Sequence, residues 1–124
     1  MNMEDVQKIE YLFIKGKKEF LAGNYYDAHE IWEELWSDYY LKDRKFIQGL
    51  IQLSVSFVHL KNSNMIGAKN LLKKSKAKFS EFKGVHRSIS IQKLKIEMNK
   101  IEKEYISLGD LESFDWSLVP KLEK

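Results

Sequence analysis

The chain has 124 residues, with 21 Lys and Arg against 18 Asp and Glu, no cysteine and one proline. The absence of cysteine excludes disulfides, cysteine-zinc sites and thiol nucleophiles. The length predicts one helical domain over residues 1–124. The acidic first residues are not typical of a signal peptide, and no run of ~18 apolar residues predicts a membrane span, so we expect a cytoplasmic protein.

Apolar residues at helical spacing predict an all-α fold with five main helices. The expected ranges are residues 4–22, 25–38, 43–62, 65–83 and 89–108, followed by an irregular tail that contains Pro120. Gly23-Asn24 ends the first helix, as glycine does at many helix C-termini. The third helix is apolar nearly all round, which predicts that the other elements surround it.

A repeat at a shift of 40 residues relates the start of the second helix to the start of the fourth. Residues 20–28 and 60–68 both read as a helix end, a tight turn that contains asparagine, and a small residue four positions later. This repeat predicts two stacked antiparallel helical hairpins, similar to tetratricopeptide repeats, plus a C-terminal helix.

Charge is distributed unevenly along the chain. Residues 1–41 carry 4 Lys against 9 Asp and Glu, whereas residues 42–103 carry 15 Lys and Arg against 4 acids. We interpret this pattern as charge complementarity within the fold. Nucleic acid is a disfavoured partner, because only two of the basic residues are Arg and no aromatic residue interrupts the lysine stripe.

Polar residues interrupt the apolar third helix along one narrow stripe, Gln48, Gln52, Ser56 and His59. Buried polar groups need partners. The second helix, joined by a short turn, carries His29 at i and a glutamate at i+4, on one helix face. We therefore expect a polar seam between the second and third helices.

Three interpretations of this seam remain open. In a metal site, His29, Glu33 and His59 would bind a divalent metal and Glu30 would be the catalytic base, because H-E-x-x-E differs by one residue from the H-E-x-x-H zinc motif. The helix register argues against this site, since it places His59 away from His29. The alternatives are a metal-free pocket for a small polar molecule or a partner's side chain, and a polar network that only fixes helix register.

The same residues carry a family resemblance. The run from Gly23 to Trp36 is similar to the G-x-[YF]-[YF]-[DE]-A-H-E-x-x-E-x-x-W signature of a small prokaryotic family, domain of unknown function 309, and residues 44–52 with His59 are similar to its second signature. The resemblance implies a compact helical fold, and some classifications call the family a predicted metal-dependent hydrolase. Trp32 departs from the family's usual aliphatic residue at that position.

The function expected from the sequence is a small-ligand pocket of unknown specificity. The seam and the resemblance share six pocket residues, His29, Glu30, Glu33, Gln48, Gln52 and His59, and the resemblance adds Trp36 and Arg44. A metal-dependent hydrolase and a helical-repeat interaction module are the alternatives. The sequence identifies no reaction, substrate, metal ion or protein partner.

Overall fold

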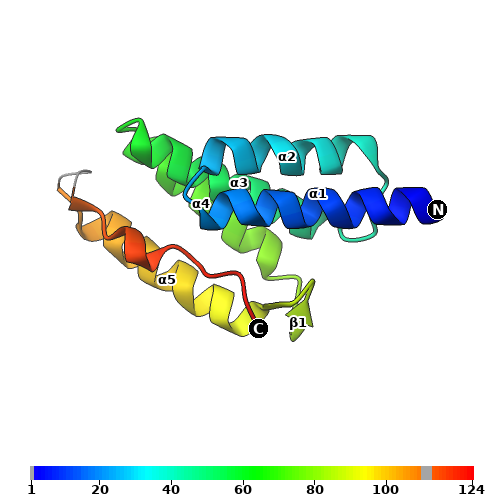
Figure 1. Ribbon diagram of the computed structural model, residues 1–124. Helices are drawn as coiled ribbons and strands as arrows, with labels where there is room; N and C mark the ends of the chain where they lie inside the picture. Colours follow the sequence, from blue (N-terminus) through cyan, green and yellow to red (C-terminus); the bar gives the residue numbers. More distant parts are fainter. Residues whose placement is uncertain (1, 110–112) are drawn as a thin grey trace.

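The computed structural model describes residues 2–109 and 113–124, and within them the predicted all-α fold is confirmed (Figure 1). The elements, in chain order, are α1 (Met3–Leu21), α2 (Tyr25–Asp38), α3 (Arg44–Lys61), α4 (Met65–Phe79), β1 (Val85–His86), β2 (Ile89–Ser90), α5 (Ile91–Ser107) and η2 (Trp116–Leu118). Successive helices α1 to α4 pack side by side as two antiparallel hairpins, and α5 packs against α4.

The predicted repeat is present in the backbone of the two hairpin tips. The Asn24 N–H donates to the Glu19 carbonyl at 2.9 Å, and forty residues later the Asn64 N–H donates to the His59 carbonyl at 2.8 Å. Gly23 and Ser63 occupy the same place in the two turns, and both have positive φ, +85° and +58°. Glycine adopts this conformation without cost, whereas serine does so less readily.

Close approach of α1 to α2 depends on Gly16. A Cβ added there would lie 2.3 Å from Nε1 of Trp32, whose indole is completely buried and donates to the Phe13 carbonyl at 3.1 Å. The hydrogen bond satisfies the one polar atom of the indole, as a buried tryptophan requires. The aromatic residue that departs from the family signature is therefore a core residue.

The predicted position of α3 at the centre of the fold is confirmed. Its apolar side chains are buried on several sides, among them Phe46, Ile47, Leu50, Leu53 and Phe57. Burial of such side chains contributes roughly 1.5–3 kcal/mol each to folding. This core fixes α3 firmly between α2 and α4, so the polar residues of α3 have defined surroundings.

Between α4 and α5, the structure differs from the prediction made from the sequence. Helix α4 ends at Phe79 rather than at residue 83, and residues 85–90 form a two-stranded antiparallel hairpin that the sequence did not predict. Arg87 and Ser88 make its turn with φ of +48° and +63°. Two successive positive φ values are typical of the type I′ turn of tight hairpins.

The tail returns along α5, as expected, and is only partly irregular. The short 3₁₀ helix η2 lies within it, Phe114 and Leu122 are buried, and the Ser90 N–H donates to the Glu123 carbonyl at 2.9 Å. Residues 110–112 of the predicted tail lie outside the described residues.

Candidate functional site

His29 lies on the outer side of α2, and its hydrogen bonds fix its tautomer. Its Nδ1 lies 2.8 Å from the Tyr26 carbonyl oxygen, and its side chain is 19% exposed. A carbonyl oxygen only accepts, so Nδ1 carries the proton. In the neutral ring, Nε2 therefore keeps a free lone pair, and this nitrogen lies 3.5 Å from Oε2 of Glu33.

The surroundings of His29 form an open hollow of about 440 Å³, the α2 hollow. Its lining residues all come from α2: Tyr26, His29, Glu30, Glu33, Glu34 and Ser37. Hydrogen bonding to the Glu30 carboxylate, helped by its charge, raises the pKa of the Tyr26 phenol. The hollow therefore offers three carboxylates, one imidazole nitrogen and two hydroxyls to a bound group.

Ser56 and His59 of the polar stripe contact α4 and α5 rather than α2, which corrects the predicted seam for these two residues. Ser56 Oγ donates to the Ala68 carbonyl at 2.7 Å and accepts from the Tyr105 hydroxyl at 3.0 Å. Nδ1 of His59 lies 3.3 Å from Nδ2 of Asn64 at the turn into α4. Burial raises the pKa of Tyr105 to about 12, which keeps its hydroxyl protonated as a donor.

The two glutamines of the stripe, Gln48 and Gln52, are half-buried. Among the described residues, neither side chain forms a hydrogen bond with a carboxylate of α2. Gln52 lies one turn before Ser56, on the same side of α3. Its Oε1 is buried and has no hydrogen-bond partner in the described structure. Nearby, Ser75 of α4 donates to the Gly49 carbonyl at 2.7 Å, so α4 is the helix that this side of α3 meets.

Trp36 and Arg44 form a separate contact at the α2–α3 turn. The Arg44 guanidinium carbon lies 4.0 Å from the centre of the Trp36 ring. A stacked guanidinium on tryptophan contributes about 0.5–1 kcal/mol where it is exposed, and more when desolvated. This contact joins the two helices but does not line the α2 hollow.

The predicted three-ligand metal site is not assembled. His29 and Glu33 lie together on α2, but His59 contacts Asn64 at the α3–α4 turn. Among residues 2–109 and 113–124, no three His, Asp or Glu side chains come close enough together to hold a metal ion. Glu30, the candidate base, is exposed and lines the same hollow as His29.

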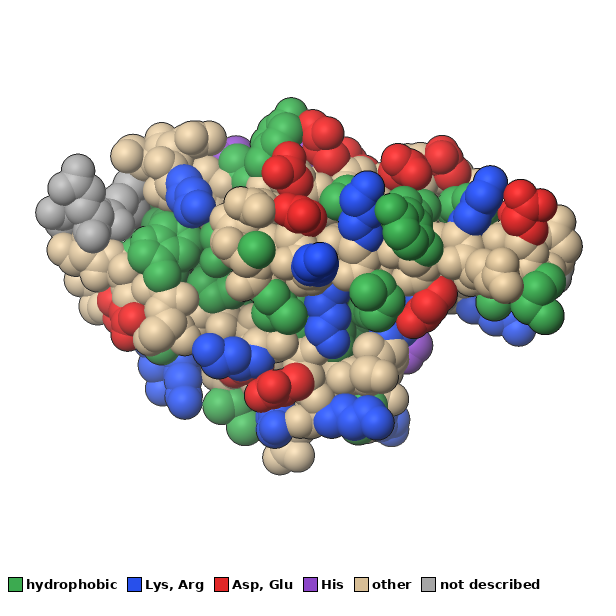
Figure 2. Space-filling view, viewed as in Figure 1, with side chains coloured by type: hydrophobic (Ala, Val, Ile, Leu, Met, Phe, Trp, Pro, Cys, Tyr) green, Lys and Arg blue, Asp and Glu red, His purple; other side chains and the backbone are tan. Residues whose placement is uncertain are grey.

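The charge pattern also differs from our interpretation. All five acidic residues of α2 are exposed, and in the described parts of the chain none forms an ion pair with a lysine or arginine. Carboxylates gather along the upper edge of the space-filling view, over α2, while lysines cover much of the lower part (Figure 2). The acidic face of α2 is therefore not neutralised by pairing with the basic segment.

Comparison with known families adds one finding. Residues 13–71 match the family described as domain of unknown function (DUF309). The DUF309 segment is just under half of the chain, and it includes all the residues that line the α2 hollow. No curated protein matches the chain. The resemblance stated from the two motifs is confirmed over this segment, and it names no activity.

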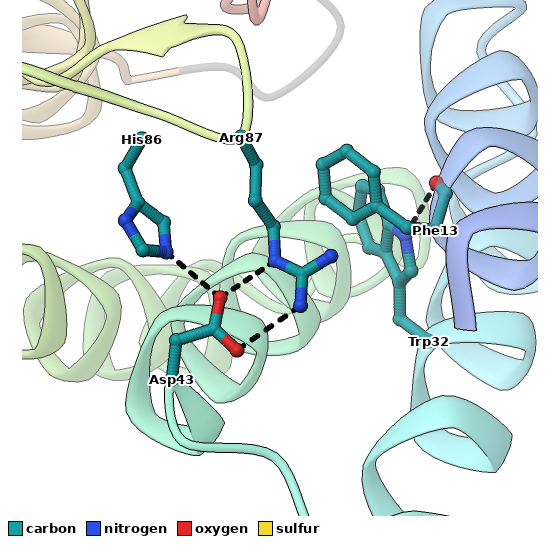
Figure 3. Close-up of polar contacts among 5 residues, drawn as sticks. All are labelled: Phe13, Trp32, Asp43, His86 and Arg87. Atoms are coloured by element: carbon teal, nitrogen blue, oxygen red, sulfur yellow. Dashed lines mark hydrogen bonds and ion pairs between the residues drawn. The ribbon is translucent and has the colours of Figure 1, made fainter. Parts of the chain in front are cut away.

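The structure brings together one polar cluster that the sequence did not predict. Asp43, at the start of α3, accepts from Nε2 of His86 at 2.8 Å and from Nε and Nη2 of Arg87 at 2.6 and 3.1 Å (Figure 3). Burial by itself would raise the pKa of Asp43, but these hydrogen bonds and positive charges outweigh it and lower that pKa. No local signal marks this pairing, because its partners lie more than forty residues apart.

The cluster joins the β hairpin to the helical hairpins. The His86 ring packs against Phe46, with centroids 4.5 Å apart, and the Arg87 guanidinium lies 5.0 Å from the Phe13 ring centre. Asp43 lies within the DUF309 segment, whereas His86 and Arg87 follow it. Both carboxylate oxygens of Asp43 already have protein donors, so we assign this cluster to the stability of the fold.

Within the described residues, none of the helices combines the length and the apolar character that crossing a bilayer requires.

Proposed function

We propose that this protein binds a small cationic ligand, an ammonium or guanidinium compound, in the α2 hollow. One observation carries the proposal: Nε2 of His29 and Oε2 of Glu33 lie 3.5 Å apart. When the imidazole is neutral, both atoms are acceptors, since the ring proton is on Nδ1. Two adjacent acceptors are favourable only when a donor lies between them, and a cationic head group supplies several N–H donors.

The charge of the hollow favours a cation over a neutral donor. Glu30, Glu33 and Glu34 line it, and no lysine or arginine is within ion-pair distance of them in the described part of the chain. Hydrogen bonds that involve a charged group contribute about 1.5–3 kcal/mol. The open shape, with walls from one helix only, fits a compact head group rather than an enclosed molecule.

The family match supports this location. All six lining residues fall within residues 13–71, which match DUF309. Four of them are residues of the motif: Tyr26, His29, Glu30 and Glu33. Exposed, partly unpaired motif residues are more typical of binding than of packing.

The test is an NMR titration of the ¹⁵N-labelled protein with butylammonium, agmatine and, as an uncharged comparison, 1-butanol. We expect the two cations to shift the His29 ring signals and the backbone amides of Tyr26 and Glu33, and 1-butanol to leave them unchanged. Paramagnetic broadening by Mn²⁺ in a separate titration reports whether a metal ion takes the same place.

A matched pair of variants separates a site from general attraction. Glu33→Gln removes one charge inside the hollow, and Asp38→Asn removes one charge from the same helix outside it. We expect Glu33→Gln to weaken butylammonium binding about tenfold, because a neutral acceptor replaces a charged one in the hydrogen bond to the ammonium. Equal weakening by both variants, or no shift with any cation, would contradict the proposal.

A further inference from the structure

A second hollow lies at the first hairpin tip and is distinct in chemistry from the α2 hollow. This tip pocket has a volume of about 330 Å³ and is lined by residues 23–27, Val58, Lys61 and Asn62. An adjoining hollow of about 240 Å³ shares Gly23, Tyr25 and Lys61 with it and adds Trp116. Three segments therefore meet here: the α1–α2 turn, the end of α3 and the C-terminal tail.

The two hairpin tips have the same backbone turn but different side-chain packing around it. At the second tip, the His59 ring packs so closely on Gly67 that a Cβ there would lie 2.8 Å from the ring, and Asn64 caps α4 by accepting from the Gly67 N–H. At the first tip, Asn24 makes no such cap, and its amide instead donates to Glu19 at 2.9 Å. A Cβ added at Gly23 would meet open space. The two tips therefore differ in the side chains that pack around their turns.

Lys61 brings a positive charge to aromatic faces in this pocket. Its Nζ lies 5.1 Å from the Tyr25 ring centre and 5.5 Å from that of Trp116, and the two rings are nearly parallel, 16° apart. Within the part of the chain that the structure describes, Nζ donates one hydrogen bond, to the Gly23 carbonyl at 3.2 Å. An ammonium has three donors, so two remain for a ligand.

Among residues 2–109 and 113–124, no carboxylate pairs with the Lys61 ammonium. Asp27 also lines the pocket, yet in the described residues Lys61 forms no ion pair with it or with any other acid. Trp116 is 38% exposed, so part of its ring is open to a ligand. A planar ring can stack on such a face while its charged substituent reaches the ammonium.

We infer that the tip pocket and the adjoining hollow together bind a planar aromatic compound that carries an anionic group, a carboxylate or a phosphate. The anion lies on Lys61, which both hollows share, and the ring lies against Trp116. This site goes beyond the proposed cation binding and does not depend on it. Because Trp116 lies outside the DUF309 segment, the tail of this chain completes a pocket whose other walls lie within that segment.

The experiment uses benzoate, phenyl phosphate and, as the uncharged comparison, benzyl alcohol. The readouts are the Gly23 amide and the indole N–H signal of Trp116, which Trp116→Phe assigns by removing it. The buried Trp32 indole, bound to the Phe13 carbonyl, is the internal control and should not shift. We expect one or both anions to shift the Gly23 and Trp116 signals, and the stronger binder identifies carboxylate or phosphate as the anion.

Two lysine variants test the role of the charge. Lys61→Met keeps the length of the aliphatic stem, and Lys73→Met removes an exposed charge from α4. We expect Lys61→Met to weaken the anion about tenfold and Lys73→Met to change its affinity by less than about twofold. The inference is overturned if benzyl alcohol binds as tightly as the anions, if both variants weaken binding alike, or if no probe shifts Gly23. Butylammonium binding at Glu33 is unaffected by any of these outcomes, so failure of one site does not decide the other.

Discussion

Two histidine–carboxylate pairs in this protein have similar chemistry and different surroundings. His86 and Asp43 come from distant segments, lie 2.8 Å apart and share Arg87 as a third member. His29 and Glu33 come from one turn of α2, lie 3.5 Å apart, and Glu33 is 57% exposed. The first pair ties two parts of the fold together, whereas the second leaves acceptors available on the surface.

The contrast shows why a histidine next to a carboxylate is not by itself a functional signal. What matters is whether the pair has spare hydrogen-bonding capacity after folding. Both oxygens of Asp43 are used by His86 and Arg87. In neutral His29, Nε2 has no donor partner among the described residues, because Glu33 also only accepts.

The largest difference between the pairs should be in stability. We expect Asp43→Ala to lower the free energy of unfolding by about 3 kcal/mol, because it leaves Arg87 and His86 half-buried without their acceptor. Glu33→Ala, the same deletion in the other pair, should cost less than about 0.5 kcal/mol, as exposed ion pairs do. Urea denaturation of both variants measures this. Equal losses would remove the distinction between the pairs.

The contribution of Asp43 to stability should also depend on pH in the acid range. The pKa of Asp43 is below its ordinary value of 3.8, so its charge stabilises the folded state fully above that value. The contribution is lost as pH falls below 3.8 and through the lower folded pKa. We expect the stability gap between wild type and Asp43→Asn to be wide at pH 6 and to narrow below pH 3.8. A gap that stays constant with pH would contradict the assigned role of the carboxylate.

We expect a smaller effect on stability in the β1–β2 turn next to His86, where positive φ values cost conformational free energy. Ser88 has a φ of +63°, a conformation that glycine adopts more easily than serine. Ser88→Gly should therefore raise the free energy of unfolding by about 0.5–1 kcal/mol. Ser80→Gly is the matched control at the end of α4, where φ is −62° and glycine should destabilise. The midpoint temperatures of thermal unfolding should change in opposite directions for the two variants, relative to wild type.

The smallest expected effect is at the surface pair. Glu33→Gln keeps the size of the side chain and removes its charge, so we expect a change in stability within about 0.5 kcal/mol. This variant therefore keeps its fold for ligand titrations. A loss above about 1 kcal/mol in thermal unfolding would show that the pair contributes to the fold, as His86 and Asp43 do.

Local signals predicted much of the fold. The range of α2, residues 25–38, was correct because Gly23-Asn24 marks its start and its apolar spacing is regular. The repeat predicted the two tips for the same reason, since turn chemistry acts within a few residues. The β hairpin was missed because Arg87 and Ser88 are not residues that signal positive φ.

The candidate site was predicted less completely. Helix α3 has neighbours on both sides, so periodicity defines its polar stripe without saying which helix the stripe meets. Ser56 and His59 turned out to contact α4, and only the α2 motif residues remained together. The Lys61–Trp116 contact could not be predicted, because residues 55 positions apart meet only through the path of the tail.

Cation binding in the α2 hollow requires that His29 present an unprotonated Nε2 there. Two-dimensional ¹⁵N NMR of the imidazole rings tests it directly, because protonated and unprotonated ring nitrogens differ widely in chemical shift. At a pH where the ring is neutral, we expect Nδ1 of His29 to carry the proton and donate it to the Tyr26 carbonyl, and Nε2 to carry none. A proton found on Nε2 and donated to Glu33 would mean that the pair satisfies itself, and would contradict the account.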